Sequence, residues 1–272
     1  MMQQDAIRLD RVHKCFGRTT ALDDISLQIR PGEFVGLLGA SGAGKSTLFR
    51  CLTALEQPDS GSVSVFGRDI SRLRAADLRD ARRDIGLIFQ QFNLIGRMSA
   101  IDNVLAGRLG HTSTWRVVVR KFTAADRQLA LESLDRVGML ERAYQRADSL
   151  SGGQQQRVAI ARVLTQRSRI VLADEPVASL DPESADTVLG TLRRIAQETG
   201  IAVLCSLHQV ELARAYADRI IGLRHGKVVI DKPPAELEPE MLTALYRRDA
   251  VISPNPLPPV TQIKAEASVT PA

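Results

Sequence analysis

The chain has 272 residues, 44% of them hydrophobic, so it can bury the core of one large domain or of a domain with a lobe. Its formal net charge is +5 at pH 7, but only 4% of its residues are aromatic, which argues against a stacking platform for nucleic acid. No apolar run approaches about 18 residues, so we expect no membrane span and no secretory signal, and membrane association would require partner proteins.

The first predicted elements are the strands of a small antiparallel sheet. Polar and apolar residues alternate there in the manner of half-buried strands. The three segments with this pattern are residues 6–12, 22–29 and 62–66.

A phosphate-binding loop follows a buried strand at residues 33–38. It fits the pattern G-x-x-x-x-G-K-[ST] and consists of Gly39, Ala40, Ser41, Gly42, Ala43, Gly44, Lys45 and Ser46, with Thr47 next in the chain. Glycines let successive backbone N–H groups point at phosphate oxygens, and the helix predicted to begin at Lys45 favours the same anion. The lysine adds a point charge toward the β- and γ-phosphates, and the hydroxyl of Ser46 can ligate Mg²⁺.

The middle of the chain is predicted to be helical. Arginine and aspartate residues alternate between Arg72 and Asp84, which is typical of a solvated helix face rather than of a nucleic-acid patch. Residues 93–165 have helical periodicity without strand signals and are predicted to form a lobe. Near its end, Ser151 and Gln154 form a capping box, and Gly152 and Gly153 leave this second helix start open to a phosphate.

The last third of the chain supplies more strands of a parallel core. An apolar run at residues 169–173 ends in Asp174 and Glu175, which places both carboxylates at the ligand-binding edge of an open sheet. There, Asp174 would hold Mg²⁺ and Glu175 would orient or deprotonate the attacking water. A second run at 201–207 ends in His208, and His225 with Gly226 predicts a hairpin turn.

Residues 250–272 form a proline-rich tail that we expect to be disordered, after a domain at residues 1–249. The cysteines, Cys15, Cys51 and Cys205, have neither metal-binding nor redox spacing. We expect them to be reduced, as in a cytoplasmic protein.

The phosphate loop and the segment Leu150–Gln154, in this order, resemble the ATP-binding cassette (ABC) family over nearly the whole chain. The resemblance implies an α/β fold: a P-loop NTPase (RecA-like) core, an N-terminal antiparallel β subdomain near the adenine, and an inserted α-helical subdomain at about 93–165. It also implies an ATP sandwich between two copies, in which Ser151, Gly152, Gly153 and Gln154 serve the γ-phosphate held by the opposite subunit.

Smaller motifs match the family in the same order. Gln90 matches the glutamine that reaches Mg²⁺ beside the membrane subunit, and Asp181 matches a loop that crosses the dimer interface. His208 matches the switch histidine at the γ-phosphate, and Phe16 the aromatic residue that stacks on adenine. Taken singly, Gln90, Phe16 and His208 would more often be packing or surface residues.

One phosphate loop, with no fused membrane helices and no β-rich regulatory domain, resembles the separate ATPase subunit of a bacterial importer. Such a subunit would lie on the cytoplasmic face of the inner membrane, with membrane permease subunits and, indirectly, a periplasmic substrate-binding protein as partners. Residues 89–95, 103–110, 114–116, 174–184 and 207–210 resemble the phosphonate-importer ATPase. An importer of phosphite, phosphate or a polar amino acid remains an alternative, as does a soluble ABC protein acting on ribosomes or DNA.

Overall fold

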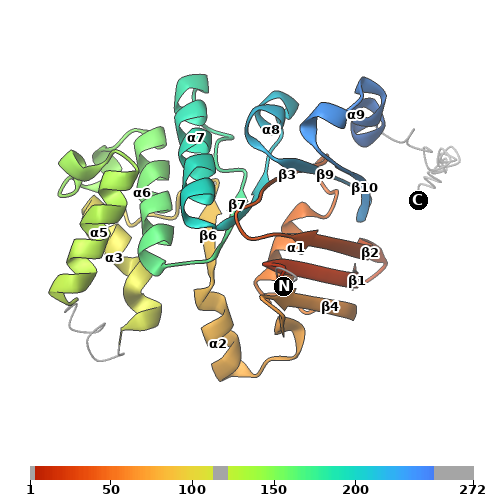
Figure 1. The fold of residues 1–272 in the computed structure, drawn as a ribbon, viewed down its shortest axis with the longest axis horizontal. Coiled ribbons are helices and arrows are strands. Elements are labelled where there is room, and N and C mark those ends of the chain that lie inside the picture. Colours follow the sequence, from red (N-terminus) through yellow and green to blue (C-terminus); the bar gives the residue numbers. More distant parts are fainter. Residues whose placement is uncertain (1–3, 113–121, 248–272) are drawn as a thin grey trace, which may run out of the picture.

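Two β-sheets and a helical lobe make up the computed structural model, which describes residues 4–112 and 122–247 (Figure 1). The smaller sheet and the lobe lie on opposite sides of the larger sheet (Figure 1). The helices of the described residues are α1 (Lys45–Leu52), α2 (Ala75–Arg83), α3 (Ala100–Leu105), α5 (Ala124–Arg136), α6 (Gly152–Gln166), α7 (Pro182–Thr199), α8 (Val210–Tyr216) and α9 (Pro239–Tyr246). Short 3₁₀ helices occur at Ile70–Arg72, Ala106–His111, Leu140–Arg142, Ala147–Ser149 and Pro234–Glu236.

The smaller sheet is antiparallel, as predicted, in the order β2-β1-β4-β5. Its strands are β1 (Ile7–Phe16), β2 (Thr19–Ile29), β4 (Ser60–Val65) and β5 (Arg68–Asp69). The first strand continues to Phe16, past the predicted end at residue 12, because it forms a hairpin with β2 in which Phe16 pairs with Thr19. The two-residue strand β5 was not predicted, since it is too short to have a period.

The larger sheet has the order β10-β9-β3-β8-β7-β6, and only its edge strand β10 is antiparallel. Its strands are β3 (Phe34–Leu38), β6 (Ile85–Phe89), β7 (Ile170–Asp174), β8 (Ala202–Ser206), β9 (Arg219–Arg224) and β10 (Lys227–Lys232). The predicted turn at His225 and Gly226 joins the last two. In register, Asp174 lies opposite both Phe89 and Ser206, so the carboxyl ends of three strands meet at one edge.

Each face of the larger sheet packs against its own apolar cluster. Ile170 and Leu172 of β7 face α1 and the smaller sheet, whereas Val171 and Ala173 face the lobe and α7. This alternation places apolar side chains on both faces, as expected of a parallel sheet covered on both sides. Helix α1 follows the phosphate loop directly in the chain, and its apolar residues pack in the cluster between the two sheets. The loop is therefore held between the buried strand β3 and the buried helix α1.

The helical lobe is built from α3, α5 and α6, which pack on one another (Figure 1). No strand occurs at 93–112 or 122–165, as expected, although Ser99 and Arg146 form an isolated bridge. The boundary residues of the lobe stay predictions. Residues 114–116 and the tail at 250–272 lie outside the described residues.

Three further expectations concern the surface and the thiols. In α2 only Ala81 is buried, which confirms the solvated face predicted for the arginine-rich stretch. All three cysteines are free thiols, and burial raises the pKa of Cys51 to about 11, so that thiol stays protonated and unreactive at neutral pH. None of the helices within 4–112 and 122–247 is long and apolar enough to cross a membrane.

Candidate nucleotide-binding site

The phosphate loop connects β3 to α1 at the carboxyl edge of the larger sheet, and its shape depends on glycine. A Cβ atom at Gly39 would lie 2.5 Å from the carbonyl oxygen of Leu223, and one at Gly44 would lie 2.4 Å from that of Ala21. Real Cβ atoms essentially never come within 3.0 Å of such atoms. Gly44 also has a φ of +108°, which side chains disfavour. The loop is thus pressed against β2 and β9.

We expect Gly44→Ala to lower the affinity for ATP by about tenfold or more, since the loop must move away from the Ala21 carbonyl. Gly200→Ala is the matched control, because Gly200 also has a positive φ, +71°, but nothing lies within 4 Å of its added Cβ. Both variants acquire backbone strain of about 1–2 kcal/mol, and only the first also has a clash. Titration with a fluorescent ATP analogue measures the difference, and equal affinities for the two variants would contradict it.

Lys45, the first residue of α1, reaches back over the loop and is 6% exposed. Its ammonium donates hydrogen bonds to the carbonyl oxygens of Gly39, at 2.7 Å, and of Ala40, at 3.3 Å. Burial lowers the pKa of Lys45, and the negative charges of Glu175 and Asp174 partly oppose that shift. The ammonium therefore lies inside the loop with its charge directed at the space where phosphate oxygens would sit.

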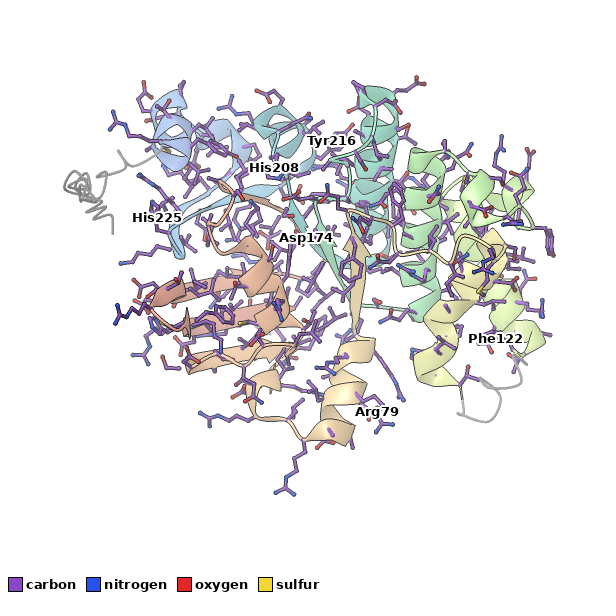
Figure 2. All side chains as sticks on the ribbon, turned by 180° about the vertical axis from the view of Figure 1, so that it is seen from behind. Arg79, Phe122, Asp174, His208, Tyr216 and His225 are labelled. Atoms are coloured by element: carbon purple, nitrogen blue, oxygen red, sulfur yellow. The ribbon has the colours of Figure 1, made fainter. Side chains whose placement is uncertain are left out.

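Asp174 and Glu175 stand at the end of β7, and His208 follows the neighbouring strand β8; Asp174 and His208 are labelled in Figure 2. Asp174 ends β7, and the next residue, Glu175, has a positive φ of +50°, which turns its side chain out of the strand direction. Its Oε1 lies 2.6 Å from Nε2 of His208. The structure thus brings Glu175 and His208, two predicted side chains from neighbouring strand ends, into contact.

Ser206, the last residue of β8, was not predicted as a site residue, yet it contacts both Asp174 and Glu175. It is fully buried; its Oγ donates a hydrogen bond to Oδ1 of Asp174 at 2.8 Å and accepts one from the N–H of Glu175, also at 2.8 Å. The available signal was a hydroxyl in an otherwise apolar strand, but its partner is visible only once the register of β7 and β8 is known.

A cleft of about 480 Å³ joins the phosphate loop to Glu175 and His208. It is lined by Thr19, Thr20, Ala21, Ala40, Ser41, Gly42, Ala43, Gly44, Lys45, Ser46, Thr47, Glu175 and His208. Thr19, Thr20 and Ala21 of β2 form part of the cleft wall, which was not predicted. They line it because β2 lies beside the phosphate loop. Ser46 and Asp174 line a second, smaller cavity, so the structure places these two predicted Mg²⁺ ligands on one side of the loop.

Apart from Gly39 and the start of α6, the predicted residues outside the lining of both cavities are Phe16, Gln90 and Asp181. Phe16 ends β1; the residue is 45% exposed, and the ammonium of Lys14 lies 5.3 Å from the centre of its ring. Gln90 follows β6 and is exposed. Asp181 caps α7, since its Oδ1 accepts a hydrogen bond of 2.9 Å from the N–H of Ser184.

The predicted capping box at the start of α6 is present. Ser151 Oγ accepts a hydrogen bond from the N–H of Gln154, and the side chain of Gln154 accepts one from the N–H of Ser151. A second reason explains why position 153 is a glycine. A Cβ there would lie 2.7 Å from Oγ of Ser184, so α7 packs against the bare backbone of α6. This helix start does not line the cleft of its own chain.

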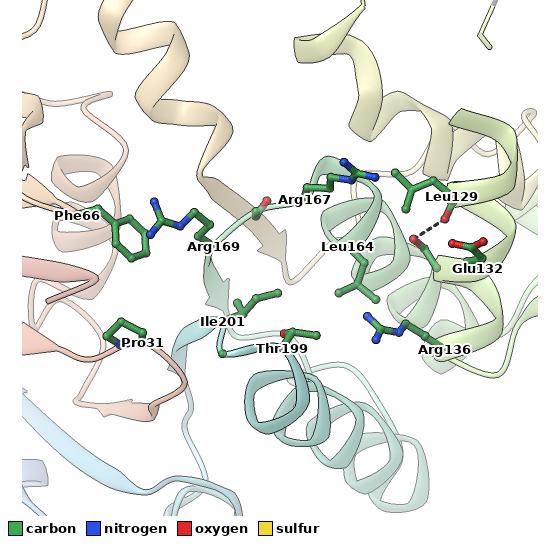
Figure 3. Close-up of a pocket in the computed structure, with 13 residues that line it drawn as sticks. Pro31, Phe66, Leu129, Glu132, Arg136, Leu164, Arg167, Arg169, Thr199 and Ile201 are labelled. Carbon is green, nitrogen blue, oxygen red and sulfur yellow. Dashed lines mark hydrogen bonds between the residues drawn. The ribbon is translucent and has the colours of Figure 1, made fainter. Parts of the chain in front are cut away.

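A separate hollow of about 420 Å³ lies between the lobe and the amino ends of β7 and β8, at the opposite edge of the sheet (Figure 3). Helices α5, α6 and α7 all end at it. Arg136 and Arg167, at the ends of the first two, face the negative ends of helix dipoles, and Arg169 stacks on the ring of Phe66 at 3.4 Å. The three arginines that line this hollow therefore have structural roles, at helix ends and against an aromatic ring. We keep the cleft at the phosphate loop as the candidate site.

Comparison with known proteins agrees with this geometry. The family model described as "ABC transporter" matches residues 22–178. The chain is 52% identical over 246 residues to the hypophosphite import ATP-binding protein of Stutzerimonas stutzeri, covering 90% of this chain and 72% of that protein. It is 51% identical over 243 residues to the phosphonates import ATP-binding protein of Frankia casuarinae, covering 89% and 96%.

Among solved structures, the chain is similar to an ATP-binding cassette determined as a dimer in a post-hydrolysis state with ADP and phosphate. The TM-score is 0.72 at 34% sequence identity, over 84% of this chain and 98% of that one.

Proposed function

The chain belongs to the ABC transporter family, and we propose that it is the ATPase subunit that energises phosphonate uptake through a bacterial importer. The observation that carries the proposal is the 51% identity to a phosphonates import ATP-binding protein over 96% of that protein's length. The cleft supports the same activity, because it combines a phosphate loop with a carboxylate and a histidine at one sheet edge.

We propose that the phosphates of ATP occupy the loop from Gly39 to Thr47 and that the exposed ring of Phe16 stacks on the adenine. Glu175 accepts a hydrogen bond from the attacking water and takes its proton as the water oxygen bonds to the γ-phosphorus, while the bond from the γ-phosphorus to the bridging oxygen of the β-phosphate breaks and ADP leaves. His208 holds the Glu175 carboxylate from the other side and contacts the γ-phosphate. These roles require Glu175 to be ionised when ATP is bound.

Mg²⁺ fits the oxygen atoms on one side of the loop. The hydroxyl of Ser46 and the carboxylate of Asp174 line one cavity, and Ser206 engages only Oδ1 of Asp174, so Oδ2 is available for a metal-bound water. Gln90, which follows β6 and is exposed, is proposed as the third ligand. When bound, the ion neutralises negative charge that develops on the phosphates.

A second copy of the chain would complete each site. The α6 start, with Ser151, Gly152, Gly153 and Gln154, presents a capped helix N-terminus outside the cleft of its own chain. We propose that it binds the γ-phosphate held by the partner, beside the loop of Asp181. The dimeric state of the similar solved cassette supports this arrangement.

The transported compound is set by the importer's other subunits, in our proposal a periplasmic binding protein and a membrane permease that docks beside Gln90. This ATPase would then lie at the cytoplasmic face of the inner membrane. Hypophosphite is the second candidate, because a relative 52% identical to this chain is named for its import. Phosphite, phosphate and a polar amino acid remain alternatives without a comparable observation.

Deleting the gene should abolish growth on an alkylphosphonate as the only phosphorus source, while growth on ample phosphate continues. Restoring the gene should rescue growth, and restoring it as Lys45→Ala should not, because that variant lacks the ammonium inside the phosphate loop. Undiminished uptake of labelled phosphonate by the deletion strain, in a host without a second importer, would contradict the substrate. If the deletion strain fails to grow when hypophosphite is the only phosphorus source but still grows on the alkylphosphonate, hypophosphite is the transported compound.

A further inference from the structure

We propose that Ser206 is a positioning residue for ATP hydrolysis, one that orients both the metal-binding carboxylate and the carboxylate that activates water. The proposal rests on the ATPase function proposed above. Ser206 lines neither of the two cavities at this edge; it would act through Asp174 and Glu175, to which its single hydroxyl is hydrogen-bonded.

The hydroxyl uses both its donor and an acceptor in this task. Its proton goes to Oδ1 of Asp174, a residue that lines one cavity together with Ser46, and leaves Oδ2 outside this bond. Since a carboxylate rotates about its last torsion, a fixed bond to one oxygen sets the direction of the other. Ser206 therefore determines which oxygen of Asp174 meets Mg²⁺ or its water.

The acceptor side of the same oxygen fixes the backbone of Glu175. That residue has a φ of +50°, a left-handed conformation that is unfavourable for a residue with a side chain. The N–H of Glu175 points at Oγ of Ser206 at 2.8 Å, which holds the peptide in the turned orientation. In this backbone conformation the Glu175 side chain contacts His208 and lines the cleft.

The sheet makes the arrangement rigid. Ser206 is opposite Asp174 in the register of β7 and β8 and next to Leu37 of β3 on its other side, so three strands fix its backbone. Its side chain is fully buried, and a buried hydroxyl keeps its partners because water cannot replace them. His208 follows Ser206 by two residues and contacts the side chain of Glu175, whereas Ser206 bonds to its backbone.

The test replaces Ser206 with Ala, and with Cys, which keeps the shape but is a much weaker donor and acceptor. We expect kcat for ATP hydrolysis to fall by about tenfold, with little change in the KM for ATP at saturating Mg²⁺. In a Glu175→Gln background, where turnover is blocked, the Mg²⁺ concentration that gives half-maximal occlusion of ATP should rise by about tenfold. Binding of ATP without Mg²⁺ should be unchanged.

Thr165→Val is the matched control. The Thr165 side chain is fully buried on α6, and its hydroxyl has no hydrogen-bond partner within the part of the chain that the structure describes. Loss of that hydroxyl should leave kcat and the Mg²⁺ requirement at wild-type values. A purely structural Ser206 would lower the melting temperature of Ser206→Ala without shifting either quantity.

The outcomes separate the two proposals. If wild-type protein hydrolyses ATP and the Ala and Cys variants keep its kcat and its Mg²⁺ requirement, the positioning role of Ser206 is wrong. If Ser206→Ala does not fold, Ser206→Cys alone decides by the same two measurements. If the wild-type transporter complex itself neither occludes nor hydrolyses ATP, the proposed ATPase function fails instead.

Discussion

Glu175→Gln should slow ATP hydrolysis by about 100-fold or more while ATP still binds. Glutamine has the shape of glutamate, and its side-chain oxygen or nitrogen can still meet Nε2 of His208, now 2.6 Å from Oε1. The amide cannot accept a proton from the attacking water, so the chemical step loses its base. With the γ-phosphate retained, two copies should stay closed on ATP as a stable dimer.

Steady-state turnover of the purified transporter complex and size-exclusion chromatography with ATP and Mg²⁺ measure the two parts of this prediction. Glu198→Gln is a suitable control, since Glu198 forms an exposed ion pair with Arg194 on α7, at 3.5 Å, and does not line the cleft. It should retain normal turnover and should not trap a dimer. Normal turnover of Glu175→Gln would remove Glu175 from its proposed role and leave no other carboxylate in the lining of the cleft.

Much of this architecture was predictable because the decisive residues lie next to one another in the chain. The phosphate loop needs glycines and a lysine at fixed spacing, and the loop and the helix from Lys45 occur where predicted. The capping box of Ser151 and Gln154 is likewise a local pattern, and the structure confirms both of its hydrogen bonds. Such features depend on a few neighbouring residues rather than on the packing of distant ones.

The features that were missed depend on register and close approach between segments far apart in the chain. Ser206 acquires its role only because β8 pairs with β7 so that it lies opposite Asp174. The wall formed by Thr19–Ala21 requires β2 to lie beside the loop. Gly153 was interpreted as an opening for phosphate, whereas its backbone is also covered by Ser184 of α7. Local patterns contain no information about which strand or helix will be adjacent.

The predicted roles of Phe16, Gln90 and Asp181 stay predictions for a related reason. In the structure Phe16 ends β1, Gln90 follows β6 and Asp181 caps α7, but none of the three side chains lines the cleft of the single chain. The resemblance places them at contacts with adenine, Mg²⁺ and a second copy. Their roles therefore depend on molecules other than this chain.

A mixed dimer tests the composite site. If Lys45 of one copy and Ser151 of the other serve the same ATP, Lys45→Ala in one copy and Ser151→Arg in the other place both defects in one site and leave the second intact. Putting both substitutions into one copy, opposite an otherwise unchanged partner, damages both sites once each. The arginine is expected to block the helix start that the glycines leave open.

The central claim, that each ATP is held between two chains, is tested most directly by counting occluded ATP in these two dimers. Each is purified through a different tag on each copy, with Glu175→Gln in both copies to prevent turnover. The account predicts one tightly held ATP in the dimer with the substitutions split between copies, and almost none when both are in one copy. The reverse result, occlusion only in the second dimer, would show that Ser151 serves the ATP of its own chain and would contradict the account.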